Sequence, residues 1–586
     1  MTVHDALRAD GLAQQFIESV HDGTVPGARR GLVEDRPFDQ LDPDIAREQP
    51  QVRHAVVVLH ADAVAVGPVF GVVVRQVVHG DFHSSQRRTG QVYAGRARGA
   101  FRLSETGSLL ATACRRAGGC RRSAHLQSLG PASGGRMLNL NAFKAYDIRG
   151  RIPDEINASL AYDIGRAFCA LVNPRQVAVG YDIRLTSPEL AAAVRRGLTD
   201  CGVDVLDIGL WGTEAAYFST FAYELDGGIM VTASHNPSDY NGMKFVRQQA
   251  RPVSSDTGLN QMRDMIAAGR LPGKAARPGS ESHLDIRARY IEHLLGYVDR
   301  ARLRKLKVVV NPGNGGAGLV IDALAPHLPF EFVKVNHQPD GTFPNGIPNP
   351  MLEENRTATA EVVRRSGADV GLAWDGDYDR CFFFDEQGTF IEGYYLVGLL
   401  AEVFLAREPG GRIVHDPRLT WNTIDIVRAH GGTPVLCRSG HAFIKQKMRE
   451  VDGIYGGEMS AHHYFRSFAY CDSGMIPWLM ALQVIAERGP LSKLVGERMR
   501  RFPASGEINR RLAGDARSIL ERLERHYGGA ALAVDHTDGL SMEFADWRFN
   551  LRGSNTEPLV RLNVESRGSE ALMREKTAEV LQLIEA

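Results

Sequence analysis

A serine between an apolar strand and a proline is the first residue whose setting suggests chemistry. Residues 228–231 form an apolar run that predicts a strand, and residues 232–237 read Thr-Ala-Ser-His-Asn-Pro. Because the residue before a proline is pushed out of the helical region, we expect a turn that exposes the hydroxyl of Ser234. Such a hydroxyl can act as a nucleophile or carry a phosphoryl group once a base, a metal or a cation activates it. His235 and Lys244 are nearby candidates for that task, and a polar turn without chemistry is the alternative.

Three aspartates at alternate positions follow a second predicted strand. Residues 375–380 read Asp-Gly-Asp-Tyr-Asp-Arg directly after the strand-like residues 369–374. On an extended chain alternate side chains point to one side, so Asp375, Asp377 and Asp379 can converge on a hard cation such as Mg²⁺. A calcium loop between two helices is excluded because an arginine stands where that loop needs glycine. An acidic hairpin is the alternative, and the mutual repulsion of three carboxylates disfavours it.

A third motif groups a carboxylate, a hydroxyl and an imidazole. Residues 456–463 place Glu458, Ser460 and His462 at alternate positions. On an extended loop these side chains face one side and can bind the vicinal hydroxyls of a sugar. Taken alone, the motif fits a buried polar turn equally well.

A fourth motif suits a phosphate monoester. Residues 552–558 read Arg-Gly-Ser-Asn-Thr-Glu-Pro, and Arg561 follows. An arginine fork, hydroxyl groups and free backbone amides are the donors that phosphate oxygens accept. Further basic residues and a tyrosine stand in two other predicted loops: Arg438, His441 and Lys445 in one, and Tyr146 and Arg149 in the other.

A glycine-rich stretch matches a dinucleotide-binding pattern only in part. Residues 313–318 fit Gly-x-Gly-x-x-Gly between a strand and a helix. The next strand, residues 330–335, ends in Asn336 and His337 and lacks the acid that would hold a ribose hydroxyl. We therefore do not expect NAD as a cofactor.

Short β-rich runs alternate with amphipathic helices from Met137 onward. For example, residues 176–180 predict a strand, residues 188–201 a helix and residues 203–208 a strand. This alternation is typical of an α/β protein with largely parallel sheets, and it recurs often enough for at least three α/β units. Residues 501–586 instead combine helices with hairpin-like strands, which predicts an α+β domain.

Composition and charge exclude several classes of protein. Lys plus Arg and Asp plus Glu balance at 69 each in 586 residues, so the overall charge predicts neither nucleic-acid nor membrane binding. The longest apolar region, residues 54–78, contains charged residues and a proline and does not fit a transmembrane helix. No signal-peptide pattern is recognisable at the beginning of the sequence. Seven cysteines without repeated spacing argue against a disulfide framework, so we expect a reducing cytoplasm.

Residues 1–136 differ from the rest of the chain. They contain no lysine, and residues 82–136 hold ten arginines against one acid, Glu105. A basic arm for a polyanion is one interpretation. We favour disorder or an extension upstream of the true start, because Met137 directly precedes the first regular segment.

Together, these motifs resemble the α-D-phosphohexomutase superfamily, and most closely its bacterial phosphomannomutase/phosphoglucomutase enzymes. The resemblance covers residues 138–586 and rests on five segments in the family's order: residues 145–150, 232–237, 375–380, 457–462 and 552–558. It implies three consecutive α/β domains with mixed sheets and a C-terminal α+β domain around a central cleft. Two departures concern Ala461, where many relatives have glycine, and Tyr378, where glycine is common.

The resemblance assigns one role to each of the four domains. We expect a phosphoserine domain at 137–284, a metal-binding domain at 285–390, a sugar-binding domain at 391–500 and a phosphate-binding domain at 501–586. Ser234 would carry a phosphoryl group, and its phosphate would complete the shell of one Mg²⁺ with the three ligands Asp375, Asp377 and Asp379.

The resemblance also implies a reaction. Phosphoserine would donate to a hexose phosphate, and the hexose 1,6-bisphosphate, both intermediate and activator, would turn around and return its other phosphate. This interconverts hexose 6-phosphate and hexose 1-phosphate and supplies nucleotide-sugar and polysaccharide synthesis. Arg380 would neutralise charge, and the candidates to assist proton transfer are Lys244, His235 and His441.

By the same resemblance, Glu458 and Ser460 would bind the O3 and O4 hydroxyls, which glucose and mannose share, so we expect activity on both sugars. The other expected substrate-binding residues are Tyr146, Arg149, His462, Arg552, Ser554, Asn555, Thr556 and Arg561. A phosphoglucosamine mutase and a noncatalytic sugar-phosphate-binding relative are the alternatives. As partners we expect small hexose phosphates, without nucleic acid or membrane, and a monomer or weak dimer.

Overall fold

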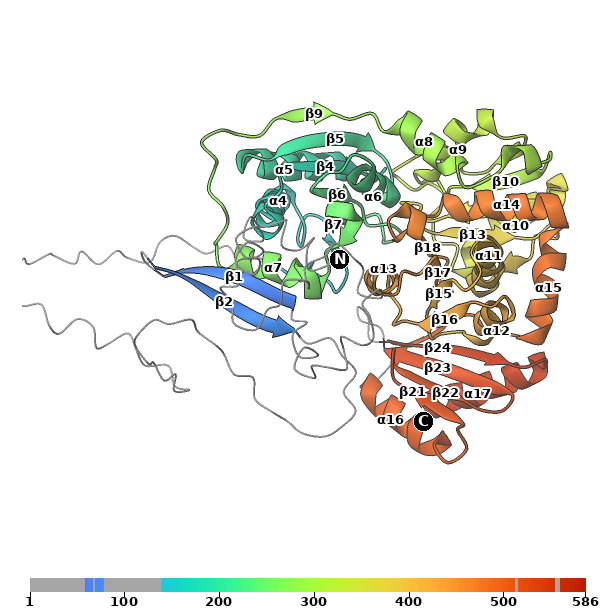
Figure 1. Ribbon diagram of the computed structural model, residues 1–586. Helices are drawn as coiled ribbons and strands as arrows, with labels where there is room; N and C mark the ends of the chain where they lie inside the picture. Colours follow the sequence, from blue (N-terminus) through green and yellow to red (C-terminus); the bar gives the residue numbers. More distant parts are fainter. Residues whose placement is uncertain (1–57, 67–68, 78–138, 512–514, 554–558, 586) are drawn as a thin grey trace, which may run out of the picture. The chain divides into compact units, whose positions relative to one another are not determined.

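The computed structural model describes residues 58–66, 69–77, 139–511, 515–553 and 559–585, and the chain divides into two units, Met1–Leu129 and Gly130–Ala586. In the first unit the structure describes one antiparallel pair of strands, β1 Val58–Val66 and β2 Val69–Val77. The sequence also predicted disorder for the rest of residues 1–136, and these residues lie outside the described ranges. The second unit contains four domains, each built on its own sheet (Figure 1).

The first domain is a mixed sheet with the strand order β3-β7-β6-β4-β5-β9, and β8 pairs with β7. Strands β4, β5, β6 and β9 run parallel, whereas β7 is antiparallel to both β3 and β6. Every residue of β6 is buried, as expected for a central strand that helices cover on both faces. The strands are β3 Ile148–Arg151, β4 Gln176–Tyr181, β5 Asp204–Leu210, β6 Gly227–Val231, β7 Tyr240–Arg247, β8 Arg251–Pro252 and β9 Glu281–His283. The helices are α4 Ala158–Val172, α5 Ser187–Asp200, α6 Thr213–Ala222 and α7 Leu259–Ala267.

The second and third domains share one topology. Their strand orders are β11-β10-β12-β13-β14 and β16-β15-β17-β18-β19, and in each the first three strands are parallel and the last two antiparallel. The second domain comprises α8 Arg287–Leu295, β10 Lys307–Asn311, α9 Ala317–Leu324, β11 Glu331–Lys334, α10 Thr357–Ser366, β12 Val370–Trp374, β13 Cys381–Phe384 and β14 Phe390–Ile391. The third comprises α11 Gly393–Arg407, β15 Arg412–His415, α12 Trp421–Ala429, β16 Thr433–Leu436, α13 His441–Glu450, β17 Tyr455–Gly457, β18 His463–Phe465, β19 Cys471–Asp472, α14 Ile476–Arg488 and α15 Leu491–Arg501.

The fourth domain is an antiparallel sheet with the order β20-β24-β23-β22-β21, and α16 and α17 pack together against it. Helix α16 buries Ile519, Leu523 and Tyr527, which recur every four residues and form one apolar stripe. Its elements are β20 Ile508–Arg511, α16 Ala516–Tyr527, β21 Ala533–Asp535, β22 Leu540–Glu543, β23 Trp547–Gly553, β24 Leu559–Ser566 and α17 Glu570–Glu585. Short 3₁₀ helices link elements of the first three domains at Gln248–Ala250, Ser255–Thr257, Arg300–Arg302, Ala325–His327, Glu353–Asn355 and Arg466–Phe468.

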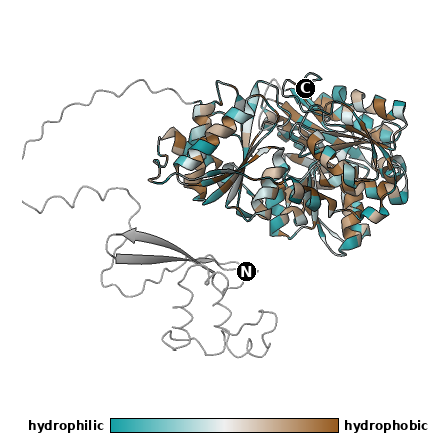
Figure 2. Cartoon of the chain, turned by 90° about the horizontal axis from the view of Figure 1, so that it is seen from above, coloured by the Kyte–Doolittle hydropathy of each residue, from teal (hydrophilic) through white to brown (hydrophobic). Residues whose placement is uncertain are grey.

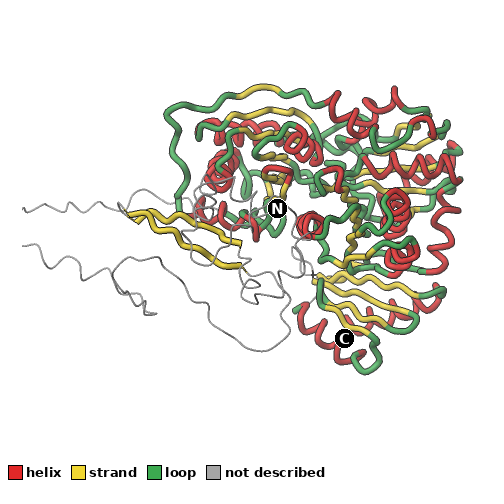
Figure 3. Tube along the Cα trace, viewed as in Figure 1, coloured by secondary structure: helices red, strands yellow, loops and turns green. Residues whose placement is uncertain are grey.

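Helices flank the strands of each sheet and present apolar residues to it. Figure 3 shows this layering, and Figure 2 shows helices that carry teal and brown residues side by side, as amphipathic helices do. Among the described residues, every helix is too short or too polar to cross a lipid bilayer.

The apolar core is continuous through the first three domains. Tyr217 of α6, Trp374 of β12 and Trp478 of α14 belong to one buried cluster, and the rings of the two tryptophans are 6.3 Å apart. The fourth domain has its own cluster, which includes Leu523 and Phe549. The first three domains therefore share one core cluster, and the fourth has a separate one.

Candidate active site

Three of the four predicted motifs stand at the carboxyl ends of parallel strands. Ser234 follows β6, the aspartates follow β12, and Glu458 follows β17. In open α/β sheets this end is where side chains meet a ligand.

Ser234 lies in a tight turn against the aspartate loop. Its backbone has φ +49°, its side chain is 2% exposed, and its Oγ donates to Oδ2 of Asp375 at 2.7 Å. His235 Nδ1 is 2.9 Å from the same hydroxyl, and Nη2 of Arg380 is 3.4 Å away. The hydroxyl is thus buried and surrounded by a carboxylate, an imidazole and a guanidinium, rather than exposed as the sequence predicted.

Arg184, which the sequence analysis missed, holds the serine turn from behind. Its side chain is 2% exposed and pairs with Asp182. Its Nη1 and Nη2 donate to four backbone carbonyl oxygens, those of Ser234, Asn236, Pro237 and Tyr240. Arg149 adds a further tie, because its Nη1 donates to Oδ1 of Asn236 at 2.6 Å and to the carbonyl of Ala233.

The three aspartates converge, but on a turn and not on an extended chain. The N–H of Tyr378 donates to the carbonyl of Asp375, and Tyr378 has φ +48°. Oxygen atoms of Asp375, Asp377 and Asp379 lie within 4.8 Å of one another, and all three residues are at most 2% exposed. Burial raises the pKa of Asp375 to about 6, although Arg380 acts in the opposite direction.

The aspartate group fits a divalent cation. Within the part of the chain that the structure describes, Oδ1 of Asp377 and Oδ1 of Asp379 are buried without a hydrogen-bond partner. Unpaired, buried carboxylate oxygens are costly unless a cation binds them, and three carboxylates are the oxygen donors that hard cations prefer.

Lys244 lies between the serine domain and the aspartates. Its Nζ is 2.9 Å from Oδ2 of Asp377 and 2.5 Å from Oδ2 of Asp379, and it also donates to Thr213. Burial alone would lower the pKa of Lys244, but the two carboxylates outweigh it and raise the pKa. Lys244 is therefore an ammonium group that can donate but cannot accept a proton.

The two histidine candidates differ from Lys244 in charge. Burial, with the guanidinium groups of Arg380 and Arg149, holds the pKa of His235 well below its usual range. Burial, with the ammonium groups of Lys445 and Lys244, does the same to the pKa of His441. Both imidazoles are neutral at physiological pH.

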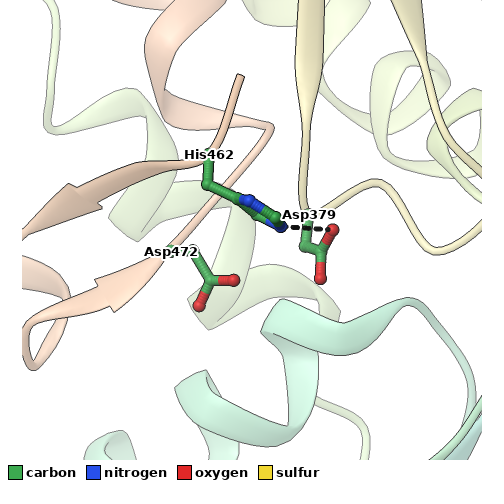
Figure 4. A group of neighbouring side chains, drawn as sticks. All are labelled: Asp379, His462 and Asp472. Carbon is green, nitrogen blue, oxygen red and sulfur yellow. Dashed lines mark ion pairs between the residues drawn. The ribbon is translucent and has the colours of Figure 1, made fainter. Parts of the chain in front are cut away.

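A second group with metal-ligand chemistry shares Asp379. Figure 4 shows His462 directed at Asp379, with Asp472 beside them, and His462 Nε2 is 3.5 Å from Oδ1 of Asp379. Oδ1 of Asp472 is 2.6 Å from Nζ of the fully buried Lys445. The set of Asp375, Asp377 and Asp379 offers three carboxylates to a hard cation, whereas this second group offers two.

The Glu458 loop is a tight hairpin turn, which corrects the predicted extended loop. The N–H of Glu458 donates to the carbonyl of His462, and Ala461 has φ +69°, a conformation that favours glycine. The turn still gathers the three predicted side chains, because His462 Nδ1 is 3.3 Å from Oε2 of Glu458 and 3.4 Å from Oγ of Ser460. Burial alone would lower the pKa of His462, but Asp379 and Glu458 raise it to about 9.

Arg418 and Glu507 connect this loop to the phosphate motif, and the sequence analysis missed both. Arg418 Nη2 donates to Glu458 at 3.1 Å and to Ser460 at 3.2 Å, while its Nη1 is 3.6 Å from Glu507. Glu507 also pairs with the two predicted phosphate-binding arginines, Arg552 at 2.9 Å and Arg561 at 3.1 Å. The predicted partners Ser554, Asn555 and Thr556 lie outside the described residues.

Two further predicted residues lie beside the Glu458 loop. The rings of Tyr146 and His441 are 5.8 Å apart, and the N–H of Gly440 donates to Glu458 at 2.9 Å. Arg438 stacks on the ring of Phe443.

The glycine-rich stretch at 313–318 packs against the loop that carries Asp375, Asp377 and Asp379. The N–H of Gly316 donates to the carbonyl of Gly376, and a Cβ on Gly316 would lie 2.9 Å from Cε1 of Tyr378. A Cβ on Gly315 would lie 2.9 Å from the carbonyl oxygen of Gly376. These glycines permit close packing within the protein.

Comparison with known proteins identifies the class to which this fold and site belong. Four family models match in order: phosphoglucomutase/phosphomannomutase domain I at residues 140–270, domain II at 288–388, domain III at 392–502 and the C-terminal domain at 507–582. The chain belongs to the phosphoglucomutase/phosphomannomutase family.

Individual relatives agree with this assignment. Phosphohexose mutases of Xanthomonas campestris pv. campestris are 59% identical over 448 residues, which cover 76% of this chain and all of the relative. A phosphomannomutase of Salmonella montevideo is also 59% identical, over 456 residues, again 76% of this chain and all of the relative. A solved family member from Burkholderia thailandensis is 32% identical, with a TM-score of 0.69, and the match covers 76% of this chain and 97% of that one.

The chain is a mutase, an intramolecular phosphotransferase that interconverts hexose phosphates. The predicted family and fold class are confirmed.

Proposed function

We propose that this mutase interconverts the 6-phosphates and 1-phosphates of mannose and glucose, and that Ser234 carries the phosphoryl group. The observation that carries the proposal is the contact of Ser234 Oγ with Asp375 at 2.7 Å, inside a buried group of carboxylates and cations. A hydroxyl placed there stands beside the charges that a transferring phosphoryl group requires.

Asp375, Asp377 and Asp379 would hold one Mg²⁺, with the phosphate of Ser234 as a further ligand. The unpaired oxygens of Asp377 and Asp379 support this set. The bound ion would neutralise negative charge on the phosphoryl oxygens.

The transfer follows from the position of Ser234. The free hydroxyl of the hexose phosphate attacks the phosphorus of phosphoserine and gives its proton to a neighbouring base, the bond from phosphorus to Oγ breaks, and a hexose 1,6-bisphosphate forms. After the bisphosphate turns around, Oγ of Ser234 attacks its other phosphorus and the isomeric monophosphate leaves. Arg380, 3.4 Å from Oγ, and the ammonium group of Lys244 compensate the charge of the phosphoryl group.

The remaining motifs would hold the sugar. Glu458 and Ser460 would bind the O3 and O4 hydroxyls, with His462, Tyr146 and Arg149 around them. The non-reacting phosphate would bind to the donors of the fourth motif, namely Arg552, Ser554, Asn555, Thr556 and Arg561. Because O3 and O4 are common to glucose and mannose, this arrangement supports both substrates, whose 1-phosphates are consumed in nucleotide-sugar and polysaccharide synthesis.

Each of these roles belongs to one domain in the proposal. We propose that residues 137–284 supply the serine, 285–390 the metal site, 391–500 the sugar loop and 501–586 the phosphate site. We further propose a cytoplasmic monomer or weak dimer, and the five described cysteines, all free, support the cytoplasm.

The first prediction concerns the carrier itself. Ser234→Ala removes the only atom that can form the phosphoester, so turnover falls by about four orders of magnitude or more. The assay measures conversion of mannose 1-phosphate and glucose 1-phosphate, together with transfer of labelled phosphate from glucose 1,6-bisphosphate to the protein. The exposed Ser282 of β9 provides the control Ser282→Ala, which retains both. Turnover by Ser234→Ala at the wild-type rate contradicts the phosphoserine mechanism.

The second prediction concerns the metal. Dialysis against EDTA removes the cation that the three carboxylates bind, so activity is lost, and Mg²⁺ restores it. Asp377→Asn and Asp379→Asn weaken the response to Mg²⁺ in a titration of activity. Full activity after complete metal removal refutes the site.

The choice of sugar is tested separately. Parallel assays with mannose 1-phosphate, glucose 1-phosphate and glucosamine 6-phosphate decide between the proposed substrates and an amino-sugar mutase. A preference for glucosamine phosphate overturns the proposed substrates but leaves the carrier role of Ser234 intact.

A further inference from the structure

Lys445 is a fully buried ammonium group with three polar neighbours. Its side chain is 0% exposed, and Nζ is 2.6 Å from Oδ1 of Asp472, 2.9 Å from the hydroxyl of Tyr217 and 3.3 Å from Nδ1 of His441. The ammonium group forms an ion pair with the equally buried Asp472. It has N–H donors and no acceptor, so Nζ is the donor to both the hydroxyl of Tyr217 and Nδ1 of His441.

The contact with His441 is fixed by helix geometry. His441 and Lys445 are four residues apart in α13, so their side chains lie on the same face. Tyr217 comes from α6 of the first domain and Asp472 from β19 of the third, and both hold Nζ in its place from outside the helix. The His441 ring therefore lies against an ammonium group, which can donate a hydrogen bond but cannot accept one.

His441 belongs to the proposed substrate site. Its ring is 5.8 Å from the ring of Tyr146, and it lies within electrostatic reach of Lys244, His462 and Asp379. Burial and the two neighbouring ammonium groups keep the imidazole neutral, so one of its ring nitrogens carries a hydrogen and the other does not.

We propose that Lys445 is a positioning residue that fixes the tautomer of His441. Because Nζ donates to Nδ1, Nδ1 is the nitrogen without hydrogen, and Nε2 carries the hydrogen. His441 then donates a hydrogen bond through Nε2 to an oxygen of the bound hexose phosphate. It does not accept a proton there. The tautomer follows from the contact with Nζ and from the neutral state of the ring, whereas the identity of the oxygen rests on the proposed function.

His441 is one of the three candidates to assist proton transfer. As a donor through Nε2, it is not the group that accepts the proton of the attacking hydroxyl.

The direct test is nuclear magnetic resonance of the wild-type full chain labelled with ¹⁵N-histidine. Two-bond ¹H–¹⁵N correlations distinguish a ring nitrogen that bears hydrogen from one that does not, and the His441→Gln variant assigns the signals by their loss. The expected pattern has Nδ1 without and Nε2 with hydrogen. The opposite tautomer, or a doubly protonated ring, overturns the proposal.

Variants then test the cause. Lys445→Met together with Asp472→Asn removes the donor without leaving a buried charge unpaired, and the His441 signals should shift toward a mixture of tautomers. Tyr217→Phe is the matched control, because it removes one acceptor of Nζ and leaves the contact with His441, so the tautomer should not change. An unchanged tautomer in the double variant overturns the role of Lys445.

Kinetics distinguish a donor from a base. A glutamine side chain can donate a hydrogen bond but cannot act as a base, so His441→Gln should retain about tenfold more turnover than His441→Ala. Equal loss in both variants contradicts the donor role. Absence of mutase activity in the wild type with every hexose phosphate would refute the proposed function, and the spectrum would still decide the tautomer.

Discussion

One guanidinium group sets the backbone on which Ser234 stands. Arg184 bonds four carbonyl oxygens of the serine turn, and Ser234 itself has φ +49°, where residues other than glycine are strained. A planar fork with five donors can hold several carbonyl groups at once, whereas an ammonium group has a different geometry and a shorter reach. The position of Oγ thus depends on a residue that touches no substrate.

The third prediction follows from that dependence. Arg184→Lys keeps the charge but loses part of the fork, so Oγ moves and turnover falls by roughly 100-fold, while KM changes little. Steady-state kinetics and the fraction of phosphorylated protein, measured by mass spectrometry, report the effect. Arg196→Lys on the exposed face of α5 is the control and retains turnover. Wild-type turnover in Arg184→Lys contradicts the positioning role.

The sequence analysis identified residues that stand in short motifs. It missed residues whose partners lie far away along the chain. Ser234 and the three aspartates stand in motifs next to predicted strands, and the structure places them together. Arg184 reaches a carbonyl 50 positions away, and Arg418 reaches Glu458 40 positions away, so no local pattern marks them. One feature of the sequence could have indicated Arg184. It follows β4, which runs parallel to β6, the strand that precedes Ser234, so both residues stand at the same edge of the sheet.

At the scale of elements, the first turn of α6 joins three domains through a buried acid. Glu214 is 0% exposed, accepts from the hydroxyl of Tyr290 in α8 and from the N–H of Met475 at 3.5 Å. Burial raises the pKa of Glu214 to about 8, although hydrogen bonds from Ser473 and Tyr290 lower it. The carboxyl group is therefore mostly protonated at neutral pH.

The fourth prediction concerns the pH dependence of stability. The folded protein binds this proton more tightly than the unfolded chain, whose carboxyl titrates near 4.5. Hence Glu214 makes its full contribution to the free energy of unfolding below about pH 4.5. That contribution declines by about 4 kcal/mol as the pH rises to about 8. Glu214→Gln removes this decline.

Urea unfolding of wild type and variant between pH 5 and 8.5 measures the difference. Glu189→Gln, in the exposed first turn of α5, is the control and keeps the wild-type dependence. Parallel curves for wild type and Glu214→Gln would show that Glu214 is ionised throughout.

Element types were predictable, and turn conformations were not. Alternating strand and helix patterns predicted the α/β domains, which the family match confirms. The Asp375 and Glu458 loops were expected to be extended because side chains alternate along an extended chain. Both are tight turns with Tyr378 and Ala461 at positive φ, a backbone state that neither residue type signals.

At the scale of the whole molecule, one buried carboxylate ties the fourth domain to the third. Glu565 of β24 is 0% exposed, and its Oε1 accepts from the N–H groups of Thr420 and Trp421 at the start of α12, at 2.7 and 3.3 Å. Arg548 of the same domain compensates it at 2.8 Å. A carboxylate at a helix N-terminus is favourable, and here it comes from another domain.

The fifth prediction uses this tie. Glu565→Gln leaves Arg548 buried without its counterion and weakens the cap of α12, which costs about 3 kcal/mol. Since the fourth domain has its own core, its amides should exchange hydrogen faster while those of the first three domains keep their rates. Hydrogen–deuterium exchange measures both, with Glu575→Gln on the exposed side of α17 as the control. Uniform acceleration across all four domains would contradict a separate fourth unit.

The ring of Tyr378 packs directly against glycine residues. The ring occupies the space where side chains at Gly212 and Gly316 would stand, and its hydroxyl accepts the N–H of Gly212 at 2.7 Å. In a relative with glycine at position 378 the space beside Gly316 is vacant, so a larger residue becomes admissible at position 316. A Cβ at Gly212 would still lie 2.2 Å from the carbonyl oxygen of Asp377, so position 212 keeps its glycine whichever residue stands at 378.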